Sequence, residues 1–302
     1  MRGLDDRGLR RARDRGELVR LHAGAYLAAA DWARLDYEQQ YRARSIAVGL
    51  ASRTRPILSH ASAAVLHGVP RLGRGERPVH VLATIAAGTR TEGDVRRHAT
   101  AHSDIQIEEI AGVRCTGLAR SLVEYAADST FAAGVVALDW ALRARPVECA
   151  PERLTVVADA LGFSRGRQRF DRALGFADAR SESVGESLSR AAIHELGFPA
   201  PILQQEFRDH SGLIGYTDFW WPEVAVFGEF DGVGKYIREE YTRGRSTAEV
   251  VIAEKVREDR IRATGPTGVR WGWEDTMSPR RLHARLSGAG LHSRARSIVH
   301  YL

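Results

Sequence analysis

The spacing of hydrophobic and polar positions changes along the chain and predicts a mixed α/β fold of the α+β type. Over residues 183–196 apolar side chains recur at positions 184, 188, 192 and 196, which is helical spacing, and Gly197 marks the end of the helix. Three strand-like segments follow, at 204–207, 214–221 and 224–231, with turn residues between them. We therefore expect a helix followed by an antiparallel meander.

The first part of the chain predicts shorter elements. Residues 7–15 form a short basic helix that Gly16 ends, and residues 17–21 and 25–27 have the pattern of a β-hairpin. Further along, we expect helices over 61–67 (capped by Ser59), over 117–127 (capped by Thr116) and over 131–143, and strands over 79–82 and 113–115.

A chain of 302 residues exceeds the usual length of one domain, so several modules are expected. The changes of pattern divide it into a segment with a basic helix and a hairpin, a mixed α/β module, a helical linker with a basic stretch, and a C-terminal domain, at residues 1–35, 36–145, 146–180 and 181–302. The basic stretch of the linker, SRGRQRFDR, is either a phosphate-facing patch or a solvated face.

Charge favours a polyanionic partner, because the formal net charge is +6. Among the 44 basic residues only Lys235 and Lys255 are lysines, and both fall in the C-terminal domain. Cys115 and Cys149 are far apart and form no CxxC pair, which argues against structural zinc and disulfides. No apolar run approaches the roughly 18 residues of a membrane span, and the N-terminus has no signal-like core, so a cytoplasmic protein is expected.

The connection between the second and third strands decides which side chains share a face of the sheet. If Pro222 and Glu223 form a two-residue loop, Trp221 lies opposite Val224. Residues 224–227 are apolar throughout, which predicts a strand that is buried on both faces. A loop with an odd number of residues would turn the third strand over.

Carboxylates gather on this predicted face. Counting back from the loop puts Asp218 opposite Phe227, and the period of two then aligns Asp218 with Glu229 and Asp231. Glu186 lies off the apolar row of the preceding helix, so we expect it to point to solvent or into a cleft. Four such carboxylates repel one another unless protons or a hard cation neutralise them, and Mg²⁺ or Mn²⁺ fits best. Such an ion can activate water for attack on a phosphodiester.

The C-terminal residues resemble the PD-(D/E)XK nuclease superfamily, in the branch close to very-short-patch repair endonucleases. The matching segments are SxxES (183–187), YTDFWWPE (216–223), VFGEFDG (226–232), AEKVREDRIR (253–262) and VRWGWE (269–274). The resemblance implies a restriction-endonuclease-like sheet flanked by helices, with Asp218 as the central metal ligand, Glu229 as the second acid and Glu186 as a ligand or water positioner.

One position departs from the superfamily motif. Asp231 stands where the motif has lysine, so the charge-balancing role passes to another cation. Lys255, on the following helix, is the first candidate and Lys235 the second.

The N-terminal half resembles the AbiEi-type antitoxin family, whose leading domain is a winged helix. The matching segments are LRRARDRGELVRLHAGAYLAA (9–29), ILSHASAAVLHGVP (57–70), PVHVLA (78–83), GVRCTGLARSLVEYA (112–126) and VVALDWALR (135–143). Family members carry a complete helix before the turn, whereas this chain begins almost at the turn, so the unit is incomplete or its start lies upstream.

A winged helix would enter a DNA groove while arginines neutralise phosphates. The candidate phosphate contacts are Arg7, Arg10, Arg11, Arg13, Arg165 and Arg167. The alternative for the first helix is a solvated basic helix beside an ordinary hairpin. In the middle module, His60 and His67 lie on one helix face, where a metal role is conceivable and a hydrogen-bonded packing role is the commoner case.

These patterns predict a metal-dependent DNA endonuclease or nickase with an N-terminal DNA-binding region. The alternative is a non-enzymatic DNA-binding regulator or antitoxin that retains a nuclease-like fold. A defence protein that couples both activities is a third hypothesis, with a toxin or defence protein as a further partner and dimerisation conceivable.

Overall fold

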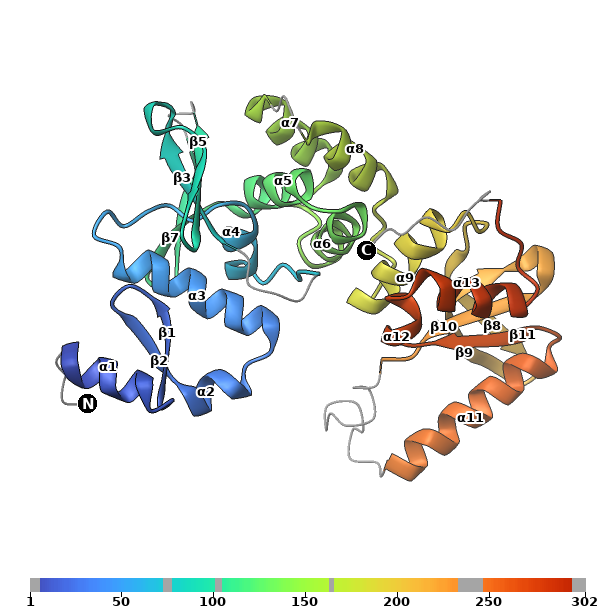
Figure 1. Ribbon diagram of the computed structural model, residues 1–302. Helices are drawn as coiled ribbons and strands as arrows, with labels where there is room; N and C mark the ends of the chain where they lie inside the picture. The colour runs from blue at the N-terminus through green and yellow to red at the C-terminus, as the bar shows by residue number, and fades with distance from the viewer. Residues whose placement is uncertain (1–5, 73–77, 101–104, 163–165, 233–246, 295–302) are drawn as a thin grey trace. The chain divides into compact units, whose positions relative to one another are not determined.

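The computed structural model describes residues 6–72, 78–100, 105–162, 166–232 and 247–294. The fold is mixed, with helices and several small sheets, and the chain divides into two compact units, residues 1–177 and 178–302 (Figure 1). The four segments expected from sequence are therefore grouped into two units, and the finer divisions within unit 1 stay predictions.

Unit 1 begins with a helix and a hairpin. Helix α1 (Asp6–Asp14) leads through Gly16, which has a positive φ of 74°, into the antiparallel strands β1 (Leu18–His22) and β2 (Ala25–Ala28). Helices α2 (Ala29–Arg34) and α3 (Tyr37–Ala51) follow. Asp36 caps α3 in a reciprocal capping box with Gln39, which satisfies backbone donors at the helix start.

The centre of unit 1 combines one helix with short strands. Its elements are α4 (His60–Leu66), β3 (Val79–Thr84), η1 (Ile85–Ala87), β4 (Arg90–Glu92), β5 (Val95–Thr100), β6 (Ile107–Ile110) and β7 (Val113–Thr116). The sheet order is β3-β5-β4 with β3 parallel to β5, and β6 and β7 form an antiparallel pair. Leu58 bridges Val81 and Cys115, so it joins the two sheets through a shared apolar core.

Four helices complete unit 1: α5 (Leu118–Asp128), α6 (Phe131–Ala144), α7 (Pro151–Leu161) and α8 (Arg167–Phe176). The N-cap of α5 is Gly117, not Thr116 as expected, because Thr116 is the last residue of β7 and its hydroxyl pairs with Ser121. The segment expected as a linker instead packs α7 and α8 against α5 and α6, and Leu154 and Phe170 are fully buried. Burial of these side chains makes the segment part of unit 1.

Unit 2 contains a four-stranded sheet with helices on both faces. Its elements are α9 (Val184–Glu195), β8 (Ile202–Asp209), β9 (Gly212–Trp221), η2 (Pro222–Val224), β10 (Val226–Phe230), α11 (Thr247–Ala263), β11 (Thr267–Trp271), α12 (Trp273–Thr276) and α13 (Pro279–Gly288). The strand order is β11-β10-β9-β8, antiparallel except for the parallel pair β10–β11.

The turn between β9 and β10 differs from the expectation. A four-residue connection, Pro222–Ala225, replaces the two-residue loop, and Ala225 adopts the left-handed conformation. Trp221 therefore pairs with Val226, not Val224, and Val224 is exposed. Because four is also an even number, the faces of β10 are unchanged although the pairing is shifted.

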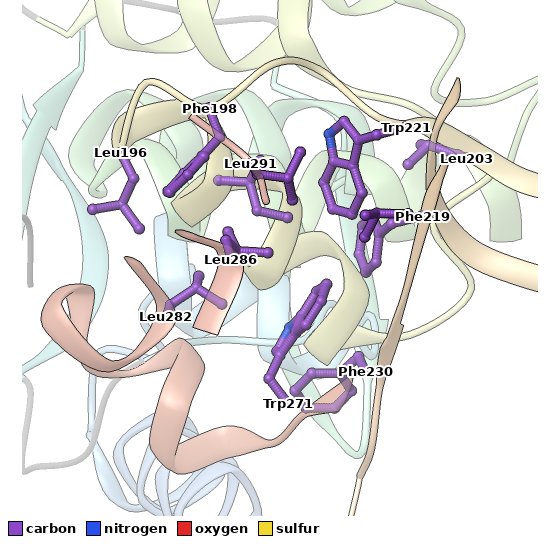
Figure 2. Packing of buried hydrophobic residues seen from close by; sticks show 12 residues of the cluster. Leu196, Phe198, Leu203, Phe219, Trp221, Phe230, Trp271, Leu282, Leu286 and Leu291 are labelled. Atoms are coloured by element: carbon purple, nitrogen blue, oxygen red, sulfur yellow. The ribbon is translucent and has the colours of Figure 1, made fainter. Parts of the chain in front are cut away.

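The apolar core of unit 2 lies on one face of this sheet (Figure 2). Phe219, Trp221, Phe230 and Trp271 project from the strands toward the helices α9 and α13, and a Cβ added at Gly185 of α9 would meet the Phe230 ring at 2.0 Å. Side chains alternate along β10, so Glu229 points to the opposite face, where α11 packs. The polar cluster of unit 2 thus lies between the sheet and α11.

None of the helices in the described part of the chain is long and apolar enough to cross a membrane.

Candidate functional site

The carboxylates expected on the sheet centre on Glu229. Glu229 is 7% exposed and sits beside Arg270 in the parallel β10–β11 register. Continuing the β9–β10 register by one residue places Asp218 opposite Glu229, not opposite Phe227. Asp218 also accepts a hydrogen bond from the backbone N–H of Phe230 at 2.8 Å, which fixes one carboxylate oxygen at the end of β10.

Two arginines neutralise this face. Arg257 of α11 forms an ion pair with Glu229, and Arg270 of β11 lies 2.5 Å from the other carboxylate oxygen of Glu229. Glu254, one turn before Arg257, receives hydrogen bonds from both guanidinium groups. Burial opposes the charge of Glu254, but these hydrogen bonds prevail and lower its pKa to about 2. The cluster is thus an ionised network that spans β10, β11 and α11.

Asp231 lies at the rim of the network, directly after β10. Its backbone N–H donates to the carbonyl of Trp271, and its side chain, which is 39% exposed, is 3.8 Å from Arg270. Arg270 is also 3.3 Å from Glu258 on α11. Asp231 therefore extends the acidic face toward solvent.

Glu186 lies in the first turn of α9, which packs against the sheet. Ser183 caps α9 by accepting from the backbone N–H of Glu186. The Glu186 carboxylate is buried and accepts from the backbone N–H of Glu182 and from the side chain of Gln204 at 3.1 Å. Its expected exposure to solvent or a cleft is replaced by these internal hydrogen bonds.

The cations beside Glu229 are Arg257 and Arg270, which sequence reasoning did not select. Lys255 lies two residues earlier on α11 and is exposed, and no ion pair of Lys255 occurs among the described residues. Lys235 lies outside the described residues. Helical spacing carried the missed signal, since Arg257 and Glu258 lie three and four positions after Glu254 and so share a face of α11 with it.

The residues at this face match the donor chemistry of Mg²⁺ or Mn²⁺. Both ions prefer oxygen ligands, and Mg²⁺ typically uses one or two carboxylates and retains water. Asp218 and Glu229 supply such a pair from adjacent strands. In the described residues no three carboxylates bring their oxygens within 4.8 Å of one another, so the fit is to a two-carboxylate site. An ion bound there would compete with Arg257 and Arg270 for Glu229.

Four of the expected DNA-contacting arginines line the exposed surface of α1: Arg7, Arg10, Arg11 and Arg13. Arg13 pairs with the neighbouring Asp14. Arg167 pairs with Asp159 and Asp171, which reduces the charge of the later basic stretch, and Arg165 lies outside the described residues.

The two histidines singled out from sequence have different environments. His67 hydrogen-bonds to the carbonyl of Thr116 at 2.9 Å, which is a packing role. His60 instead stacks on His98 and lies near His80, two residues that sequence reasoning did not consider. Intervals of 20 and 18 residues carry no local periodicity, so only the tertiary fold reveals this histidine cluster.

Comparison with known proteins gives relatives without an assigned activity. Two uncharacterized proteins of Mycobacterium tuberculosis, from strains CDC 1551 and H37Rv, are each 28% identical to this chain over 186 residues. The aligned region covers 60% of this chain and 64% of each relative, so the chain spans less than two thirds of their length. No protein-family model and no solved structure matches the chain.

Proposed function

We propose that unit 2 is a metal-dependent DNA endonuclease or nickase of the PD-(D/E)XK type. The observation that supports it best is the apposition of Asp218 and Glu229 on neighbouring strands, at a sheet face that Arg257 of α11 contacts. Opposed residues of antiparallel strands have Cβ atoms about 5 Å apart, a spacing from which two carboxylates can share one divalent cation. The helix–meander–helix–strand order of unit 2 agrees with this class.

Asp218 and Glu229 would hold Mg²⁺ or Mn²⁺, and the ion would supply an activated water and a Lewis acid for phosphodiester hydrolysis. The backbone N–H of Phe230 orients one oxygen of Asp218, which leaves little freedom for that carboxylate. Asp231 at the rim would position water or substrate at the outer side of the site, because its side chain is 39% exposed whereas that of Glu229 is 9% exposed.

Arg257 would take the charge-balancing role that the superfamily motif gives to lysine. Its guanidinium bridges Glu229 and Glu254 and also donates to the carbonyl of Tyr216 at 2.9 Å. When Glu229 binds the metal ion, Arg257 would keep its ion pair with Glu254. Its remaining N–H groups would donate hydrogen bonds to a phosphate. Arginine suits this exchange because its planar fork binds carboxylate and phosphate alike.

The test is the cleavage of supercoiled plasmid by the purified full-length chain with Mg²⁺ or Mn²⁺, and with EDTA as the blank. Asp218→Asn keeps the shape of the side chain and removes its charge, and we expect a loss of about 100-fold or more, the usual cost of removing one preorganised electrostatic group. Asp259→Asn, an exposed acid elsewhere on α11, is the matched control and should cut like the wild type. Equal cleavage by all three proteins would remove the proposal.

A second candidate function is a metal-independent DNA-binding regulator or antitoxin. The exposed arginines of α1, followed directly by the β1–β2 hairpin, favour it. Binding of a duplex in EDTA should weaken with salt, and Arg10→Ala with Arg11→Ala should lower the salt slope by about 0.9 for each phosphate that the variant no longer neutralises. Arg281→Ala, an exposed arginine of unit 2, is the control. An unchanged slope in the double variant would exclude this use of α1.

A further inference from the structure

Three histidines from distant parts of the sequence converge inside unit 1. One nitrogen from each of His60, His80 and His98 lies within 4.8 Å of the other two. The rings of His60 and His98 stack at 3.7 Å between centroids, and those of His80 and His98 at 5.0 Å. Among the described residues, no other three histidine, cysteine or carboxylate side chains lie this close together.

The fold holds each histidine in place. His80 and His98 project from the parallel strands β3 and β5, where Leu82 pairs with His98, so the two histidines share a face. The backbone N–H of His80 donates to the hydroxyl of Ser62, and its carbonyl accepts from Ser59. The cluster therefore belongs to the core of unit 1.

His60 approaches from the first residue of α4 with a left-handed backbone, φ 50°. A residue with a side chain in that region costs about 1–3 kcal/mol, and such strain concentrates at functional sites. The backbone N–H of His60 is held by the carboxylate of Glu124 at 3.1 Å, which stabilises this conformation.

The hydrogen bonds of the cluster leave the imidazoles suited to bind a metal ion. His60 Nδ1 lies 3.1 Å from the Ser59 hydroxyl and 3.4 Å from Glu124, which leaves its Nε2 as the ligand atom. A carboxylate on the second ring nitrogen is the usual outer partner of a metal-bound histidine. Burial is the main cause that lowers the pKa of His60, His80 and His98, so the rings are neutral, the form that binds metals.

The contact between His80 and His98 is close to the spacing of two ligands of one ion. His80 Nδ1 and His98 Nε2 are 2.9 Å apart. Two imidazole ligands of a tetrahedral Zn²⁺ lie about 3.3 Å apart, given Zn–N bonds of about 2.0–2.1 Å. A movement of a few tenths of an ångström therefore converts this nitrogen–nitrogen contact into two metal bonds.

The surroundings leave room for a fourth ligand. A cavity of about 160 Å³ adjoins the cluster, and its lining includes His60 and His80 together with Tyr125, Asp128 and Ser129. Of the arginines that act on the cluster, Arg120 is paired with Glu124 at 2.7 Å and Arg96 with Asp128 at 3.4 Å, which limits their repulsion of a cation. Three histidines with one open position form the ligand set of catalytic zinc sites.

We propose that His60, His80 and His98 bind a divalent transition-metal ion, Zn²⁺ by preference, whose fourth position opens to this cavity. The site lies in unit 1 and uses nitrogen ligands, so it is separate from the carboxylate site of unit 2 and stands without the proposed nuclease function. Nitrogen donors favour Zn²⁺ over Mg²⁺, which prefers oxygen.

The test uses the untagged full-length chain, stripped with EDTA and titrated with Zn²⁺ by calorimetry. We expect one tight equivalent in the wild type, and binding weakened by more than about 10–100-fold in His98→Ala, since loss of even an outer partner of a ligand costs that much. His210→Ala, an exposed histidine of unit 2, should bind like the wild type. The apo forms are compared by circular dichroism to verify that they are folded.

Cobalt substitution provides a measurement that needs no variant. Co²⁺ in the wild type should give the intense visible absorption of a tetrahedral centre, at one equivalent, and Zn²⁺ should abolish it. No tight equivalent of Zn²⁺ together with no such absorption would overturn the proposal and leave a hydrogen-bonded histidine stack. Tight binding that His98→Ala and His60→Gln both retain would equally overturn it.

Discussion

The two units accommodate buried ionisable side chains in different ways. In unit 2, Arg257 and Arg270 contact both Glu229 and Glu254 directly, and their hydrogen bonds lower the pKa of Glu254 to about 2. In unit 1, the histidine cluster is kept neutral, as the lowered pKa values of its three members indicate. The difference shows that a buried group either keeps its charge beside a partner of opposite sign or gives the charge up.

This contrast has consequences for binding. The carboxylate face of unit 2 already holds its cations as arginine side chains, so an added metal ion has to displace one of them. In the histidine cluster, a metal ion would replace the nitrogen–nitrogen contact between His80 and His98 and would displace no arginine. The site proposed in unit 1 is thus the softer, nitrogen-rich one and that proposed in unit 2 the harder, oxygen-rich one.

The largest expected effect is the loss of the charge of Glu229. Glu229→Gln removes one of the two carboxylates that Arg257 and Arg270 share and leaves them with Glu254, in a site where the Glu229 side chain is 9% exposed. Breaking one partner of a buried ion pair typically costs about 3–5 kcal/mol. Urea unfolding monitored by tryptophan fluorescence measures it, and a change below about 1 kcal/mol would mean that water already screens these charges.

Acidification should distinguish the two units. The ordinary pKa of histidine is 6.5, whereas that of His80 in the fold is about 2, so below pH 6.5 the unfolded chain binds protons that the folded unit 1 rejects. As the pH is lowered below 6.5, the free energy of unfolding therefore decreases by about 1.4 kcal/mol per pH unit for each histidine that stays neutral in the fold. Glu124 offsets part of this loss, because burial raises its pKa and it takes up a proton in the fold.

Unit 2 should lose stability only at a lower pH than unit 1. The pKa of Glu254 is about 2 in the fold against an ordinary 4.5, so its contribution is present above pH 4.5 and is lost only as the pH falls from there toward 2. Segment-resolved hydrogen exchange in EDTA at pH 7 and pH 5.5 compares the units. Equal loss of protection in both would contradict the assignment of neutral histidines to unit 1.

A smaller effect is expected from the hydroxyl that supports the histidine cluster. Ser62 accepts from the backbone N–H of His80 at 2.8 Å and pairs with Tyr41 at 2.7 Å, and it is fully buried. Ser62→Ala leaves that N–H without its acceptor, which costs about 1–3 kcal/mol. Tyr41→Phe is the comparison, because it leaves the Ser62–His80 bond intact and should cost less. Equal losses of unfolding free energy in both variants would show that the Tyr41–Ser62 hydrogen bond, and not the hydrogen bond from His80 to Ser62, determines the stability.

The smallest effect is expected at an exposed ion pair of unit 2, which serves as the counterpart of Glu229. Arg281 and Glu274 are 2.8 Å apart, with side chains 58% and 85% exposed. Exposed pairs contribute about 0–1 kcal/mol, so Glu274→Gln should change the free energy of unfolding by less than about 1 kcal/mol. A loss as large as that of Glu229→Gln would show that burial does not separate the two classes of ion pair.

Periodicity determined the local elements and part of the acidic face. The spacing of apolar residues predicted the helix at α9 and the strands β8, β9 and β10, because these patterns depend only on neighbours a few residues away. The common face of Asp218 and Glu229 also followed, since it needs only an even number of residues in the turn. The pairing itself did not follow, because the left-handed backbone of Ala225 lengthens that turn.

Tertiary structure alone decided what surrounds the charged and titratable groups. Arg257 and Arg270 reach Glu229 from a helix and a strand that lie 28 and 41 residues further along the chain, and His60, His80 and His98 meet through a helix start and two parallel strands. Side-chain neighbours across such distances depend on how elements pack, and the alternation of residues within one element does not encode that. The sequence by itself therefore determined the elements and the acids, while packing decided which partners neutralise them and brought the histidines together.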